Sequence, residues 1–247
     1  MTLELDARFV ARFLSASLAM LFTANLAVHG LYLLTDHDHQ LGLRYLFDMS
    51  GEWNVPALYS GALILSNALL LAHIGFRLRD AGAKQWESWC ILSVIFLYLS
   101  IDEIVSIHEK LALPTREMFN LSGLLYFGWI LPGMAFALVV FLSFLRFLCR
   151  LDRSSRSLFL RAGTMFISGA VGFEMLGGWR FEATAGNTDD PIYIAFSACE
   201  ETLEIAGMSL MFYALVRHAS RLFGHVRVRL PKGIVILARR RPARSGA

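Results

Sequence analysis

Charged residues are scarce in this chain of 247 residues. They make up 17% of the sequence, whereas a typical soluble domain carries about 25%. Hydrophobic residues make up 56%, and several continuous apolar runs reach the roughly 20 residues that a helix needs to cross a hydrocarbon core of about 30 Å. The composition therefore excludes an ordinary water-soluble domain and predicts an all-α, polytopic membrane helix bundle.

Several familiar motifs are also lacking. The three cysteines, Cys90, Cys149 and Cys199, form no CxxC pair and no disulfide framework. There is no Glu-x-x-His motif of the kind that four-helix di-iron proteins use, and no internal repeat that would indicate an inverted-repeat transporter. The first apolar run lacks a small-x-small cleavage site and follows Glu4 and Asp6, so we expect a retained span and not a signal peptide.

Six apolar segments are present, and we expect each to cross the membrane as a helix. Their approximate limits are Phe9–Leu34, Pro56–Phe76, Trp86–Glu109, Leu124–Leu148, Leu158–Trp179 and Ile192–Val216. Asn54 is placed to cap the second helix, with Pro56 in its first turn, and Pro132-Gly133 predicts a kink in the fourth. Residues 1–217 are thus expected to form a six-helix transmembrane domain, and residues 218–247 a basic tail.

The basic residues predict the orientation of this bundle. Nineteen of the 23 Lys and Arg residues fall on one side of the six predicted spans, and by the positive-inside rule that side is the cytoplasm. Both termini are then cytoplasmic in a multi-pass inner-membrane protein. The chain from Arg217 onward holds nine basic residues and no acid, which favours contact with anionic lipid in the bilayer over nucleic acid.

Acidic residues show the opposite bias, and two acidic stretches lie within apolar segments. The first contains Asp102, Glu103, His108 and Glu109, and the second contains Glu200, Glu201 and Glu204. A carboxylate inside a membrane helix costs about 2.5–3.5 kcal/mol on insertion scales, so such residues are rare and usually functional. No Lys or Arg lies near them in either span, so a bound cation or protonation must compensate their charge.

Helical geometry predicts how these side chains are presented. On a continuous helix, Asp102, Ser106 and Glu109 fall within about 60° of one another, and Glu200 and Glu204 are one turn apart, where two negative charges repel. The fifth segment adds Glu174 in a glycine-rich stretch that allows close helix approach. All of these groups fall in the outer halves of their spans, which predicts one site that faces the periplasm or exterior.

Carboxylates combined with an imidazole are ligands that suit a divalent metal ion such as Fe, Zn or Mn. The candidate metal-binding residues are Asp102, Glu103, His108, Glu109, Glu174, Glu200, Glu201 and Glu204. Asn25 and His29 of the first segment are expected at the same depth. A network of interhelical hydrogen bonds without any ligand is the structural alternative.

The motifs also resemble those of a family of uncharacterised bacterial multi-pass membrane proteins. The matching stretches are Phe47-Asp48 with Glu52, Asn54 and Pro56; Leu99-Ser100-Ile101-Asp102-Glu103 with His108-Glu109; Leu124 to Phe127 through Leu131-Pro132-Gly133; and Glu200-Glu201 with Glu204 and Gly207. The resemblance covers about residues 45 to 216. It implies a shared membrane architecture, and no activity is carried over from that family.

The sequence predicts a membrane metalloprotein with a carboxylate and histidine site in its extracytoplasmic half. It leaves open whether the protein is an enzyme; if it is one, a lipid-soluble substrate fits a chain without a soluble domain. One alternative is a cation or proton-coupled transporter that uses the same carboxylates. The other is a non-catalytic subunit of a larger membrane complex.

Overall fold

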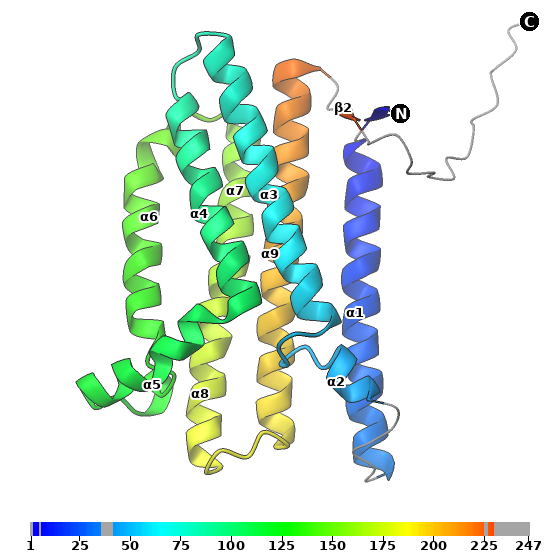
Figure 1. Ribbon diagram of the computed structural model, residues 1–247, viewed down its shortest axis with the longest axis vertical. Coiled ribbons are helices and arrows are strands. Elements are labelled where there is room, and N and C mark those ends of the chain that lie inside the picture. The colour runs from blue at the N-terminus through cyan, green and yellow to red at the C-terminus, as the bar shows by residue number, and fades with distance from the viewer. Residues whose placement is uncertain (1, 5, 36–41, 225–226, 230–247) are drawn as a thin grey trace, which may run out of the picture.

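The apolar segments fold into long helices that stand side by side (Figure 1). The computed structural model describes residues 2–4, 6–35, 42–224 and 227–229. The longer helices are α1 (Ala7–Thr35), α3 (Val55–Asp80), α4 (Trp86–Val105), α5 (Ile107–Phe119), α6 (Ile130–Arg150), α7 (Arg153–Ile167), α8 (Glu174–Ala183) and α9 (Pro191–Phe223). The short elements are β1 (Thr2–Glu4), α2 (Leu43–Phe47), a 3-10 turn η1 (Gly123–Leu125), a π-helical segment η2 (Ser168–Phe173) and β2 (Arg227–Arg229).

Four helices in the described part of the chain are long and apolar enough to cross a membrane. They are α1 over Ala7–Tyr32, α3, α4 and α6, which confirms four of the six predicted spans by length and composition. The other two predicted spans are also helical. The continuous rod α7–η2–α8 and the long helix α9 run alongside the first four (Figure 1).

Side-chain caps begin several helices where the sequence predicts it. Asn54 caps α3, because its Oδ1 accepts a hydrogen bond from the backbone N of Ala57 at 3.0 Å, and Pro56 lies in the first turn. Asp190 caps α9 by accepting from the backbone nitrogens of Ile192 and Tyr193. Such caps satisfy backbone donors that have no partner within the helix.

The third predicted span is wrong at its end, because the helix does not continue to Glu109. It stops at Val105, and Ser106 adopts a left-handed conformation with φ 53°. A new helix, α5, then leaves the bundle at a steep angle (Figure 1). Pro114 lies inside α5, and the predicted stripe of Asp102, Ser106 and Glu109 on one continuous helix does not exist.

Two further details differ from expectation. Pro132 is the third residue of α6, where its missing N–H costs no intrahelical hydrogen bond, so the predicted kink within the fourth span is absent from this helix. The fifth span is interrupted by the π-helical segment η2. A single extra residue of this kind rotates everything that follows by about 100° around the helix axis.

Helix α9 occupies the middle of the bundle and packs against α1, α3, α7, η2 and α8. It approaches α7 closely at Gly207, where an added Cβ would lie 2.7 Å from the backbone N of Phe166 and 2.8 Å from the carbonyl O of Ala162. Glycine therefore lets α9 and α7 come together there, as small residues do in membrane bundles. Helix α6 stands apart at one edge of the bundle (Figure 1).

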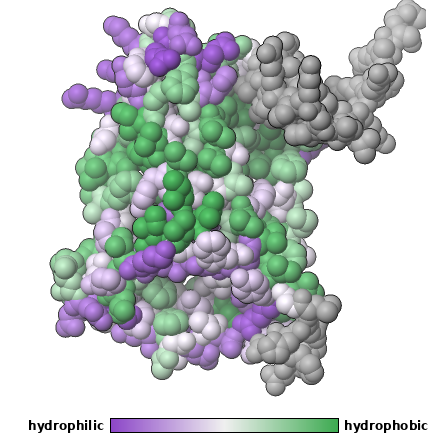
Figure 2. Space-filling model, viewed as in Figure 1, coloured by the Kyte–Doolittle hydropathy of each residue, from purple (hydrophilic) through white to green (hydrophobic). Residues whose placement is uncertain are grey.

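The two described ends of the chain meet at one end of the bundle. Strand β1 pairs with β2 in antiparallel register, with Leu3 opposite Val228. Helix α9 continues to Phe223, beyond the predicted domain limit at residue 217, and the predicted tail from residue 230 onward lies outside the described residues. Figure 2 shows hydrophilic residues gathered at both ends of the molecule and a mainly hydrophobic band between them.

Candidate functional site

A large cavity runs through the bundle between α4 and α5 on one side and α7, α8 and α9 on the other. Its volume is about 1430 Å³, above the roughly 300–1,000 Å³ of most ligand pockets. Helix α6 contributes a further wall, from Pro132 near its start to Leu148 near its end. The break at Ser106 and the offset position of α6 create this space.

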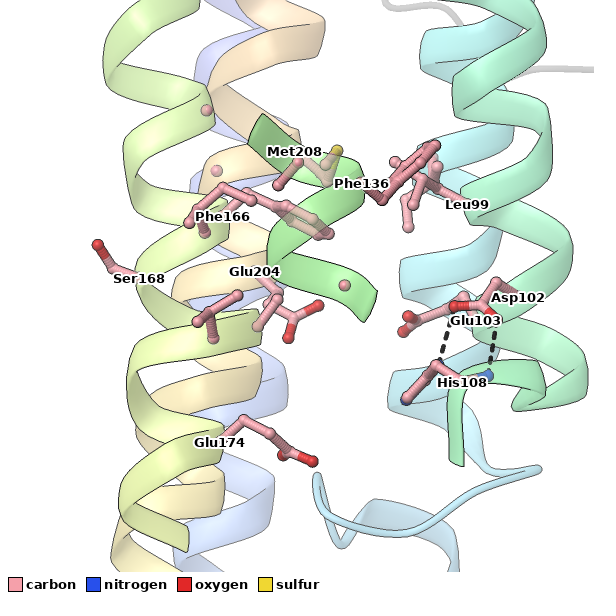
Figure 3. A pocket seen from close by; sticks show the side chains of 18 of the residues that line it. Leu99, Asp102, Glu103, His108, Phe136, Phe166, Ser168, Glu174, Glu204 and Met208 are labelled. Carbon is pink, nitrogen blue, oxygen red and sulfur yellow. Dashed lines mark hydrogen bonds and ion pairs between the residues drawn. The ribbon is translucent and has the colours of Figure 1, made fainter. Parts of the chain in front are cut away.

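All eight side chains that the sequence nominated line this one cavity. Eight carboxyl groups and one imidazole contribute to its lining, and no Lys or Arg is among the lining residues that the structure describes. The carboxyl groups are those of Glu52, Asp102, Glu103, Glu109, Glu174, Glu200, Glu201 and Glu204. Figure 3 shows Asp102, Glu103 and His108 on one wall, with Glu174 and Glu204 on the wall opposite.

Asp102 and His108 form the best-defined pair in the cavity. One carboxylate oxygen of Asp102 accepts a hydrogen bond from the backbone N of His108 at 3.0 Å, and the other lies 2.8 Å from His108 Nδ1. A carboxylate only accepts hydrogen bonds, so Nδ1 carries the proton and Nε2 is the ring nitrogen that can bind a ligand. The turn at Ser106 makes this possible by folding α5 back toward Asp102.

The charge of Asp102 also affects the titration of His108. Burial alone would lower the pKa of this imidazole, but the hydrogen bond and the negative charge of Asp102, helped by Glu174 and Glu109, raise its pKa above the ordinary value. His108 also lies against Trp129, with ring centroids 4.7 Å apart. Asp102 thus orients His108 and favours its protonated form in the absence of a bound cation.

Glu109 lies close to Glu52, which comes from the loop before α3. Burial raises the pKa of Glu109 to about 7, together with the hydrogen bond and negative charge of Glu52. Two carboxyl groups can form a hydrogen bond only if they share a proton. Glu52 lies in one of the stretches that resemble the uncharacterised family, but it is not among the predicted site residues. Nothing in the local sequence shows that this loop folds over the cavity.

The opposite wall is built by η2, α8 and α9. Glu174 follows directly after η2; its Oε1 accepts a hydrogen bond from Trp129 Nε1 at 2.9 Å, and its side chain also contacts Glu200. At Gly169 an added Cβ would lie 2.6 Å from the carbonyl O of Glu200. The π-helical turn therefore serves both to rotate Glu174 and to bring α9 close.

Asn25 and His29 do not line the cavity, contrary to the expectation that the first span contributes to the same site. Asn25 Oδ1 accepts a hydrogen bond from the backbone N of Met49 at 2.9 Å, and His29 Nε2 lies 3.2 Å from Asp48 Oδ1. Both side chains are almost fully buried. Their role is to hold the loop that carries Glu52 over the cavity.

The cavity changes character beyond the acidic level. Leu99, Phe136, Phe166 and Met208 form the next layer (Figure 3). Apart from Thr164 on α7, the lining then stays apolar toward the end of the bundle that carries the chain termini, along residues Leu92, Ile95, Phe96, Phe144, Phe147, Leu148, Phe159 and Met211. We call this region the apolar arm.

An aromatic cluster closes the arm. Trp89, only 2% exposed, packs edge-on against Phe147 and Phe159 with ring centroids 5.0 and 6.1 Å apart. His218 stacks on the same indole and lies 2.8 Å, through Nδ1, from Ser155 Oγ. At this end of the arm, the side chains therefore pack closely against one another and close the cavity.

The donor set suits a divalent metal, but its groups are spread over two walls. Among residues 2–4, 6–35, 42–224 and 227–229, no three His, Cys, Asp or Glu side chains converge closely enough to hold one ion. The oxygen and imidazole donors of the lining fit a divalent metal ion. A tetrahedral or octahedral site needs its ligands close together, so the glutamate side chains would have to rotate toward one another to form one.

Residues 13–219 match a family model described as "Domain of unknown function (DUF8692)". This match covers most of α1 and α9, the whole of the other long helices and every acidic residue of the cavity. No curated protein and no solved structure matches the chain.

Proposed function

Because this chain belongs to the DUF8692 family, whose description states no activity, we propose a function from the cavity itself. The protein is an integral membrane protein that binds a divalent metal ion, such as Fe, Zn or Mn, between the two acidic walls. The observation that carries the proposal is that eight carboxyl groups and one oriented imidazole line one cavity, with no basic residue in its described lining. Such a lining attracts cations and needs one, or protons, for charge balance.

The proposal places six helical rods across the bacterial inner membrane. The four apolar helices are joined by α7–η2–α8 and α9, of which Glu174, Glu200, Glu201 and Glu204 line the cavity. With 19 of the 23 basic residues on one side, both termini are cytoplasmic and the acidic level opens to the periplasm or exterior. The nine basic residues from Arg217 onward would contact anionic lipid headgroups.

His108 and the glutamates have different roles in this proposal. His108 would bind the ion through Nε2 while Asp102 holds Nδ1, which is the common carboxylate–histidine–metal arrangement. Glu109, Glu174, Glu200 and Glu204 would supply oxygen ligands. Glu103 and Glu201, which lie near one another across the cavity, would hold protons or orient the ligands.

An enzymatic role follows if a substrate reaches the ion. A bound metal ion would supply Lewis acidity and would activate water or oxygen. In this chain, Trp129 would fix the orientation of Glu174, and a carboxyl group that does not bind the ion would move protons. The apolar arm would hold a lipid-soluble substrate away from water.

Transport of cations or protons by the same carboxylates is the rival function, and the apolar arm argues against it. A transport route would have to continue from the acidic level to the cytoplasmic end. That direction is lined by Leu92, Phe144 and similar side chains, and it ends at the packed aromatic cluster around Trp89. A non-catalytic subunit of a membrane complex would need no cavity of this volume.

Elemental analysis of the detergent-purified protein tests the proposal. We expect stoichiometric metal in the wild type and its loss in Asp102→Asn and Glu204→Gln. Glu117→Gln is the matched control, because Glu117 is exposed on α5 and does not line the cavity; it should keep the metal. A wild type that is folded, stable and free of metal would sink the proposal.

A further inference from the structure

The apolar arm has the dimensions of a lipid chain. Leu92 and Glu103 both line the cavity on α4, and their separation in sequence places them about 16 Å apart along the helix at about 1.5 Å per residue. On α6 the apolar lining extends from Phe136 to Leu148, which is about 18 Å by the same rise. The arm is thus long and lined by apolar side chains.

A glycine leaves room within the wall of the arm. An added Cβ at Gly163 would have no atom within 4 Å, although this residue lines the cavity. Gly163 lies in the interior of α7, where glycine is less favourable than alanine by about 1 kcal/mol. Its position beside open space means that a larger side chain would project into the arm without displacing the backbone.

The acidic end selects the head of the molecule that enters. Eight carboxyl groups surround that level, and a single divalent ion would offset only two negative charges. A carboxylate or phosphate head would meet repulsion there, because no Lys or Arg is present in the described lining. A cationic or uncharged head would instead find acceptors for its N–H or O–H groups.

We infer that the cavity takes a single-chain amphiphile, with its alkyl chain in the apolar arm and a cationic or uncharged head among the carboxyl groups. This rests on the proposed function, because it names the substrate class of the same site. Measured from the probe dissolved in water, each methylene that the arm buries would strengthen binding by about fourfold until the arm is filled.

Binding of matched long-chain probes to the protein in lipid nanodiscs, measured in excess of their uptake by empty nanodiscs, tests this inference. The probes are hexadecylamine, hexadecanol and hexadecanoic acid, with octylamine as the short-chain comparison. We expect the amine and the alcohol to bind, the acid to bind at least tenfold more weakly, and octylamine to bind much more weakly than hexadecylamine. Equal binding of the amine and the acid, or no dependence on chain length, would overturn the inference.

Two variants place the chain in the arm. Gly163→Phe should abolish the preference for the long chain while leaving metal content unchanged, and Gly163→Ala should behave like the wild type. Ile95→Phe, on the facing helix α4, provides a second block if Gly163→Phe fails to fold. Long-chain binding that survives in a folded blocking variant contradicts the inference.

Metal content measured on the same samples separates the two ideas. Metal-free wild type that still selects the long-chain amine would overturn the proposed metal site and leave this inference standing. Metal-loaded wild type without head or chain selectivity would do the reverse.

Discussion

Asp102 is the residue on which the geometry of His108 depends. It caps the start of α5 and holds the imidazole through separate oxygens, so one carboxylate fixes both a backbone turn and a ring orientation. Asn at this position keeps the shape but removes the charge. It therefore separates the electrostatic role of Asp102 from its place in the turn.

Asp102→Asn should lower the pKa of His108, because burial then acts with only the more distant charges of Glu174 and Glu109 opposing it. Histidine NMR titration of metal-free protein measures the change. Asp48→Asn is the control, since Asp48 pairs with His29 and not with His108; it should leave the His108 titration in place. An unchanged His108 titration in Asp102→Asn would contradict the assigned pairing.

Glu109 should make the metal-free protein less stable as the pH rises. Its folded pKa is raised from 4.5 to about 7, so between these values the folded state binds more protons than the unfolded state, and stability falls with increasing pH. We expect Glu109→Gln to reduce the decline in unfolding midpoint between about pH 5 and about pH 8.

The exposed neighbour Glu117 provides the comparison for this experiment. Glu117→Gln should decline with pH as the wild type does. Because Glu52, His108 and Glu174 also face Glu109, some pH dependence will persist in Glu109→Gln. A decline as steep as that of the wild type would show that Glu109 does not carry the excess proton.

At the scale of elements, apolar run length predicts the helices well but not their interruptions. The limits of α1 and α3 and the start of α9 lie within a few residues of the predicted limits. Helix α9 ends at Phe223 and not at the predicted Val216. The break at Ser106 was missed because a left-handed residue within an apolar run has no marker in composition, and the π-helical turn was missed because its sequence is compatible with an α-helix. Both interruptions position site residues.

The crossing of α7 and α9 should depend on glycine. Gly207→Leu would place side-chain atoms within 3 Å of the backbone at Ala162 and Phe166, and overpacking of this kind costs about 1–3 kcal/mol. We expect a clearly lower unfolding midpoint in detergent. Gly163→Ala, where the added Cβ meets open space, should leave the midpoint unchanged or slightly higher. Equal midpoints in the two variants would show that the helices do not cross this closely.

At the scale of the whole molecule, the number of membrane crossings has a direct test. In a cysteine-free background, Asn187→Cys lies in the turn between α8 and α9, and Lys84→Cys lies in the turn between α3 and α4. Six crossings with cytoplasmic termini predict that an impermeant maleimide labels position 187 but not position 84 in spheroplasts. If only the four apolar helices cross, position 187 stays on the cytoplasmic side and is not labelled.

The location of the site was more predictable than its internal contacts. Carboxyl groups within apolar runs are unusual enough to be recognised from the sequence as site candidates. All eight predicted site residues line the cavity. Glu52 and Trp129 were not nominated, because each lies at a helix start or in a loop where polar and aromatic residues are common. Their inclusion depends on long-range packing, such as the attachment of the 48–49 segment to α1, which a single sequence does not reveal.

The pairing of β1 with β2 has a consequence for the order of assembly. During synthesis β1 emerges long before β2, so its backbone groups have no strand to pair with until α9 is complete. The pairing of β1 with β2 brings the two described ends of the chain together, so the path of the described chain closes on itself. A circular permutant that joins the present ends and opens elsewhere, for instance between α5 and α6, should keep the same helix neighbours and the same cavity, with only the order of insertion changed.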